Sequence, residues 1–462
     1  METRRVSRVI EVNTMAILDA SGLHKGSQEL IDDRIAFLEA VRSATLVPDN
    51  GIAPTNKMFE AIFEIMKDEN SLELLMASYH LLIELEKHFP RVYTPKVEAS
   101  SLPSTSNVPE LVVIEEAWSP FMFGSDGYRE NACKNSGGWL DPSGFHLLIE
   151  DLAKVAIETK FEKLEVKSLR NMLLVQYLIT VLEGDFTPRN SMCKENMDWK
   201  LLRESLLNML LASRRMNFKT LIKDFLSIMC EMPDVGTEIS YGMRSPENSI
   251  AGTAIAISFP EVKNCTSSAL QKFLLMAMEL DISKKKAEML GLTTRADGAR
   301  AAVLDIIHDE LSYNRSSLSP FFQVFVEPKW KLEIIIKYFQ KYITKRSVRT
   351  RQSNDPIYDA TFDGILKCFS NSNTAKSITK KISTEVVQLL LAHAFQAFLA
   401  LPSQHSPEGV CHSKDVKDSS LVEICKNLIY AFTNLRRIDE HAEIMSFGKE
   451  ALFIAGTILS MT

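Results

Sequence analysis

The sequence predicts an all-α protein, an irregular α-solenoid of armadillo- or HEAT-like stacked helix pairs. Apolar residues recur at steps of three and four through most of the 462 residues, which is the spacing of one helix face. No stretch alternates apolar and polar residues between turn signals, as a half-buried strand would. No fixed repeat period is found, but armadillo and HEAT repeats are degenerate enough to leave none.

The first part of the chain, residues 1–93, is predicted to be an N-terminal helical segment. A stripe of apolar residues from Ile31 to Val41 lies on one face of an early helix. Asn70 and Glu73 have the spacing of a capping box, which predicts the start of a further helix.

Residues 94–143 are expected to interrupt the helices as a flexible linker followed by a glycine-rich loop. The stretch 94–110 contains three prolines and four serines, a composition that cannot bury a core. The stretch 124–143 contains four glycines and Trp139. It predicts a surface loop that the tryptophan holds in place.

The remainder, residues 144–462, is predicted to be a C-terminal helical-repeat region with loops at about 233–264 and 402–419. Its longest uncharged apolar run, 386–407, contains polar side chains and a proline. A bilayer span needs roughly 20 mostly apolar residues, so we expect a core helix and a soluble protein. The strongest helical signals cover 145–163, 167–183, 198–213, 217–231, 266–281, 298–312, 328–343, 384–401, 420–436 and 448–460.

No motif for catalysis, nucleotide binding or metal binding is complete. The phosphate-binding patterns GxxxxGK[ST] and GxGxxG and the zinc patterns CxxC and HExxH are absent. The pair Cys411-His412 has no second pair of ligands. Ser377 to Lys380 fits S-x-x-K without its companion motifs, so a helix cap at Ser377 is the better explanation. We expect no enzyme activity, no cofactor and no metal.

Positive charge is concentrated between Lys329 and Lys381. This stretch has twelve basic and four acidic residues, so its local net charge is +8. Because the net charge of the whole chain is −6, the residues outside this stretch together carry a net charge of −14. Such a cluster can hold phosphates or serve as a nuclear-import signal. It can equally be a solvated face, or pair with the acidic remainder of the chain. No helix-turn-helix or zinc-finger pattern accompanies it. The candidate nucleic-acid or partner-binding residues are Lys337, Lys341, Lys345, Arg346, Arg349, Arg351, Lys376, Lys380 and Lys381.

Several stretches, in order and across almost the whole chain, resemble a plant family, the negative regulator of systemic acquired resistance. None of them has a generic catalytic meaning. The stretch 240–263 departs from the family pattern as an unusually long loop. The matching stretches are LVPDNGIAPTNKMF (46–59), EEAWSPFMFGSD (115–126), DFTPRN (185–190), LDISKKKA (280–287), PKWKLEI (328–334), VRTR (348–351), ITKKI (378–382) and FGKEALFIAGTIL (447–459).

The resemblance implies an armadillo-like nuclear protein that represses defence-gene expression and restrains homologous recombination and the DNA-damage response. It also implies a subunit of the chromosome-maintenance complex that pairs two SMC ATPases with a SUMO ligase. There the family forms a heterodimer with a second non-SMC subunit, and no catalytic residues come with it. The expected partners are these proteins, with non-specific DNA contact as an open alternative, and neither a membrane nor a small-molecule substrate. The alternative hypothesis is a peptide-binding armadillo-type adaptor in nuclear transport or signalling.

Overall fold

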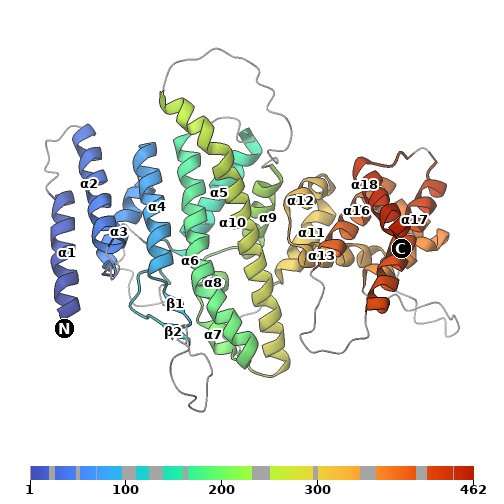
Figure 1. Cartoon of the computed structure of the whole chain (residues 1–462), viewed down its shortest axis with the longest axis horizontal. Helices are drawn as coiled ribbons and strands as arrows, with labels where there is room; N and C mark the ends of the chain where they lie inside the picture. The colour runs from blue at the N-terminus through green and yellow to red at the C-terminus, as the bar shows by residue number, and fades with distance from the viewer. Residues whose placement is uncertain are drawn as a thin grey trace. The chain divides into compact units, whose positions relative to one another are not determined.

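The computed structural model describes residues 2–19, 27–47, 52–68, 70–95, 111–123, 139–159, 165–231, 250–294, 300–343, 361–401, 414–440 and 442–461. The fold is all-α, as predicted, because helices form nearly all of the regular structure in these ranges (Figure 1). The chain divides into two compact units, residues 1–306 and 307–462. Each unit is described by itself below.

The first unit contains ten helices among its described residues that lie wholly within it, and one small two-stranded sheet. In the sheet, β1 (Val92–Tyr93) pairs antiparallel with β2 (Val112–Val113). The helices are α1 (Glu2–Asp19), α2 (Ser27–Thr45), α3 (Asn56–Asp68), α4 (Leu72–His88), α5 (Pro142–Thr159), α6 (Val166–Asn196), α7 (Trp199–Arg203), α8 (Leu206–Ala212), α9 (Phe218–Glu231) and α10 (Ile250–Met289).

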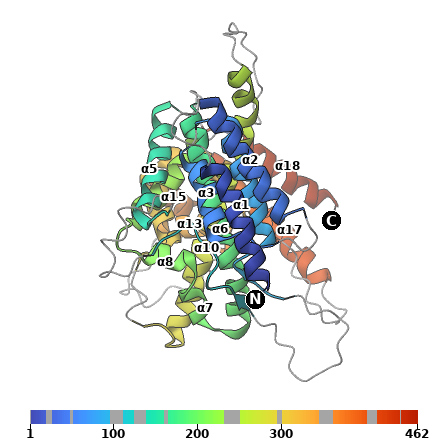
Figure 2. The same cartoon turned by 90° about the vertical axis from the view of Figure 1, so that its left-hand side faces the viewer.

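Helices of the first unit pack side by side in chain order. Contacts run from α1 to α2, from α2 to α4, from α4 to α6 and from α6 to α10, while α5 packs against α9 (Figure 1). Seen from the side of α1, several of these helices lie one behind another (Figure 2). Each buries an apolar stripe; α3, for example, buries Met58, Ile62 and Met66 at helical spacing. The first unit is therefore a solenoid-like stack of helices, as the patterning predicts.

A buried glutamine joins three of these helices. The Tyr79 hydroxyl of α4 donates to Gln176 Oε1 of α6 at 2.9 Å. Gln176 Nε2 in turn donates to the Val262 carbonyl at 3.1 Å and to Thr266 Oγ1 at 2.9 Å, both on α10. When the oxygen and the nitrogen of a buried amide both have hydrogen-bond partners, those bonds persist only in one arrangement of the surrounding helices. Gln176 therefore fixes how α4, α6 and α10 align.

In the second unit, α13 (Pro328–Tyr342) packs on α16 (Thr384–Ala400), and α14 (Phe362–Ser370) packs on α17 (Lys414–Ile438). Both α16 and α17 pack on α18 (Ser446–Met461). α11 (Val303–Tyr313) crosses the boundary between the units. In the described ranges, no single helix is long and apolar enough to cross a membrane; the bent pair α15 and α16 reaches that length and composition together. The other elements are η2 (Arg315–Ser317), α12 (Leu318–Val324) and α15 (Ser372–Ile382).

Part of each stretch predicted as a loop, 233–264 and 402–419, is helical. α10 begins at Ile250 and continues through Pro260, and α17 begins at Lys414. The loop prediction is therefore wrong for residues 250–264 and 414–419. Helix propensity is a weak guide in these stretches, because tertiary context overrides it.

Two predicted helix caps are also wrong. The residue that caps α4 is Ser71, one position after Asn70, and its side chain makes no capping hydrogen bond. Ser377 lies in the middle of α15, whose N-cap is Asn371 with its side chain accepting from two backbone N–H groups. Asn70 lies one position from the observed cap, which is within the usual uncertainty of helix ends, whereas Ser377 lies six positions after Asn371, inside the helix.

The predicted boundaries at residues 93 and 143 fall inside the first unit. Residues 96–110 and 124–138 of the predicted linker lie outside the described residues. At the end of that stretch, Trp139 Nε1 donates to Glu60 Oε1 at 3.2 Å. This bond ties the tryptophan to α3.

Candidate binding surface and buried polar network

The candidate basic residues fall on two helices and one stretch outside the described residues. Lys337 and Lys341 lie on α13, and Lys376, Lys380 and Lys381 lie on α15. The remaining four candidates, Lys345, Arg346, Arg349 and Arg351, lie outside the described residues.

The ends of α13 and α15 meet through Lys381. Its Nζ donates to the Tyr342 carbonyl at the end of α13, at 3.4 Å. The Lys381 carbonyl, at the end of α15, accepts from Arg315 Nη2 at 2.8 Å. Carbonyls in the last turn of a helix lack internal partners, so cationic side chains bind there readily. The structure thus adds Arg315, which the sequence reasoning missed because it precedes the basic stretch.

The exposed residues Arg315, Lys341, Lys380 and Lys381 are called the basic patch from here on. All four are solvent-exposed. Lys341 and Lys380 make no ion pair within the part of the chain that the structure describes. Pairing with the chain's own acidic residues is therefore not observed for these two lysines. Their ammonium groups are free to hold an anionic partner.

Other lysines of α13 are placed differently. Lys337 is half-buried. Lys331 is half-buried as well, and burial lowers its pKa to about 8. Lys329 Nζ lies 5.2 Å from the centre of the Trp330 ring. The number of lysines in the sequence of α13 therefore overstates the positive charge that this helix exposes to solvent.

The structure offers no group of three or more His, Cys, Asp or Glu side chains able to hold a metal ion, within the ranges it describes. Cys411 and His412 lie outside those ranges. His393 is buried, with 4% of its surface exposed. The rings of Phe322 and Phe447 flank it at centroid distances of 5.9 and 5.2 Å.

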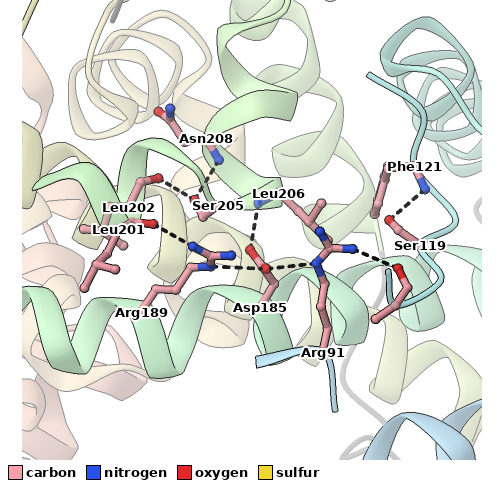
Figure 3. Close-up of polar contacts among 11 residues, drawn as sticks. Arg91, Ser119, Phe121, Asp185, Arg189, Leu201, Leu202, Ser205, Leu206 and Asn208 are labelled. Carbon is pink, nitrogen blue, oxygen red and sulfur yellow. Dashed lines mark hydrogen bonds and ion pairs between the residues drawn. The ribbon is translucent and has the colours of Figure 1, made fainter. Parts of the chain in front are cut away.

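The most complete polar cluster of the first unit is buried around Asp185 of α6 (Figure 3). Asp185 is 1% exposed and Arg189, one turn later, 3% exposed. Arg189 Nε donates to Asp185 Oδ1 at 3.3 Å, and its Nη1 donates to the Leu201 carbonyl at 3.2 Å. The backbone N–H of Leu206 donates to Asp185 Oδ2 at 2.7 Å. The pair therefore holds the α7–α8 segment against α6.

Arg91 connects this cluster to the segment that carries the sheet. Its Nε lies 3.6 Å from Asp185 Oδ1, an ion pair too long for a hydrogen bond. Its Nη1 donates to the Ala117 carbonyl at 3.0 Å. Burial raises the pKa of Asp185, while Arg189, the Leu206 N–H and Arg91 oppose that rise. The two arginines thus stabilise the carboxylate that joins three segments.

Asp281 of α10 repeats the arrangement. One carboxylate oxygen pairs with Arg300 Nη2 at 2.6 Å, and the other accepts the N–H of Val303, the first residue of α11, at 2.8 Å. The Arg300 guanidinium lies 4.6 Å from the centre of the Phe218 ring. In both cases an aspartate accepts a free N–H at a later helix start and pairs with an arginine.

Two stretches that resemble the plant family supply these residues. DFTPRN contains Asp185 and Arg189, and LDISKKKA contains Asp281. Ser283 Oγ donates to Asn190 Oδ1 at 3.4 Å, which links the two stretches across α6 and α10. The sequence reasoning missed this role. An Asp and an Arg four residues apart on one helix were the available signal.

Fold and surface together define an all-α protein of stacked helix pairs with an exposed basic patch. Two family models match the chain, the SNI1 middle domain over residues 91–327 and the SNI1 C-terminal domain over residues 343–462. A relative from Arabidopsis thaliana, the negative regulator of systemic acquired resistance SNI1, is 43% identical over 452 residues, which cover 97% of this chain and 94% of the relative. The chain belongs to the SNI1 family, and the resemblance expected from the sequence is confirmed.

Proposed function

We propose that this chain is a non-catalytic nuclear regulator that restrains systemic acquired resistance. One observation carries the proposal: the 43% identity to a relative named for that function extends over 97% of the chain. The matched span includes both family domains. The absence of a complete catalytic motif in the sequence supports a role through binding.

The finer proposal is a subunit role in chromosome maintenance. The protein forms a heterodimer with a second non-SMC subunit and joins the complex of two SMC ATPases and a SUMO ligase, through which it acts in the DNA-damage response and recombination control. A stack of helices supports this role because it presents a long surface to protein partners. The basic patch supports a sequence-independent contact with DNA.

Complementation tests the regulatory role. An Arabidopsis thaliana line that lacks the relative should regain repression of its defence genes when it expresses this chain. A variant with Asp185→Ala, whose buried cluster is broken and whose fold should be destabilised, is the negative control and should not restore repression. Unchanged defence-gene expression with the wild-type chain present in the nucleus would contradict the proposal.

Co-purification and cross-linking mass spectrometry test the partners. Tagged protein from nuclei should recover the second non-SMC subunit and the SMC proteins. Recovery of transport factors in their place would instead favour a peptide-binding adaptor in nuclear transport. Microscopy of the same tagged chain tests the nuclear location.

A further inference from the structure

A pocket lies where α6 and α10 end and α7 begins, a part of the first unit that carries none of the basic patch. α7 lies beside the end of α10 in both views (Figures 1 and 2). The pocket is a shallow hollow that is open to solvent, and its cavity volume is about 30 Å³.

Backbone geometry at two helix ends creates the pocket. Met197 ends α6 in the left-handed region, with φ at 56°, and turns the chain so that Trp199 packs back as part of the lining. Gly291 follows the end of α10 with φ at 70°, and the N–H of Leu292 donates to the Ala287 carbonyl at 2.9 Å. This is the usual closure of a helix by a left-handed glycine. It folds Leu292 back over the end of α10.

The pocket is apolar inside and at its mouth. Trp199, Cys193 and Ala287 line it as buried residues. Three further apolar lining residues remain between 43% and 57% exposed, and they are Met197, Leu290 and Leu292. Large apolar side chains that stay half exposed around a hollow are typical of an interaction site.

The charged residues that line the pocket are both lysines. Lys194 Nζ is already paired with Glu279 at 2.6 Å. Lys286 is exposed, and its ammonium group forms no ion pair or hydrogen bond anywhere in the described ranges. No carboxylate is among the lining residues. Lys286 is therefore the free charge at the mouth of an apolar pocket.

We propose that this pocket binds a peptide segment of a partner protein that presents one large apolar side chain beside an Asp or Glu. The apolar side chain packs over the hollow against Trp199 and Leu290, and the carboxylate pairs with Lys286. Because the mouth is open, a small molecule would remain partly in water. A peptide covers the exposed Met197, Leu290 and Leu292 with its own backbone and neighbouring side chains. The proposal does not depend on the proposed function.

Both lysines also lie in the last turn of a helix, where a cation stabilises the partial negative charge of the helix end. A test must therefore separate binding from stability. The chain offers matched controls, because Lys285 and Met289 are exposed neighbours of Lys286 and Leu290 that do not line the pocket.

The experiment selects peptides from a phage library of random 12-residue sequences against the full chain. Enriched peptides should share a large apolar residue next to an acidic one. By fluorescence anisotropy, Lys286→Glu and Leu290→Asp should each weaken the best peptide about tenfold or more, a loss of about 1.4 kcal/mol. Lys285→Glu and Met289→Asp should bind as the wild type does. Thermal melts of all four variants check that the fold is intact.

Three outcomes would overturn the proposal. The selection could yield no peptide above background. The enriched peptides could lack the acidic residue and bind Lys286→Glu unchanged. The control variants could lose as much affinity as the pocket variants, which would show that general charge or hydrophobicity governs binding.

Discussion

Asp185 and Leu206 lie 21 positions apart in the sequence, yet the Asp185 carboxylate accepts the backbone N–H of Leu206 at 2.7 Å. Leu206 is the first residue of α8, and the N–H groups of a first helical turn have no partner within the helix. The bond therefore satisfies a buried donor at one helix start with a side chain from the middle of another helix.

Removal of the Asp185 carboxylate should destabilise the first unit strongly. Asp185→Ala leaves Arg189 buried without its counter-charge and Leu206 without its acceptor, and breaking such a pair costs about 3–5 kcal/mol. Asp185→Asn keeps an oxygen acceptor and should lose less. Urea unfolding gives the free energies. Asp198→Ala, which removes the exposed cap of α7, is the control and should cost about 1 kcal/mol; equal losses at the two sites would contradict the argument.

Glu86 should make stability depend on pH. Burial raises the pKa of Glu86 to about 7, with Arg91 opposing the rise and Asp185 adding to it. A carboxyl whose folded pKa is raised keeps its proton in the folded state, so stability is lost as pH rises from about 4.5 through 7. Glu86→Gln should therefore raise the free energy of unfolding at pH 8 by up to about 3 kcal/mol and leave it unchanged at pH 4. A stabilisation that does not vary with pH would point to packing instead.

His393 should also make stability depend on pH, but with stability lost as the pH falls. Burial, with the charge of Lys331, lowers the pKa of His393 to about 4. The unfolded chain then binds a proton that the folded chain does not, so stability falls as pH falls from about 6.5 towards 4, by up to about 3 kcal/mol. His393→Phe removes this fall, which unfolding curves at pH 7 and pH 4.5 would detect. The exposed His80→Gln is the control and should keep the wild-type profile.

Two glycines of α18 should respond oppositely to alanine. A Cβ at Gly448 would lie 2.8 Å from Phe432 Cε1 and 3.0 Å from Ile444 Cγ2, whereas nothing lies within 4 Å of one at Gly456. Gly448→Ala should cost about 1–3 kcal/mol through overpacking. Gly456→Ala should stabilise by up to about 1 kcal/mol through helix propensity. Thermal melts of the two variants should move in opposite directions, and a shift of the same sign would show that α18 packs differently.

The basic patch should contribute to any binding of duplex DNA. Changing Lys341 and Lys380 together to Glu should reduce the slope of log K against log salt by about 2, because each phosphate contact contributes about 0.9. A fluorescence-anisotropy salt titration measures the slope. The same change at Lys426 and Lys449, exposed residues of α17 and α18, is the charge-matched control. An unchanged slope in the patch variant, or an equal change in the control, would exclude phosphate contacts by the patch.

The helical class of the protein could be read from the sequence because each helix must bury an apolar stripe, and that stripe leaves a period of three to four in the chain. Met58, Ile62 and Met66 show this directly, since all three are buried at the predicted spacing. The ends of helices could be predicted less well from the sequence. The patterning predicted a helix over 167–183, whereas α6 continues through Pro188 to Asn196.

Local sequence determined that the protein is helical and where positive charge accumulates, since both depend on neighbouring residues. Tertiary structure alone decided which charged side chains are exposed to solvent and which form ion pairs inside the fold. Arg189 is buried and Arg300 is half-buried, each beside an aspartate, and Lys331 is half-buried, whereas Lys380 is exposed without an ion pair to any described residue. The physical reason is that the cost or benefit of a charge depends on its desolvation and on partners far away in the chain. A sequence shows neither until the helices have packed.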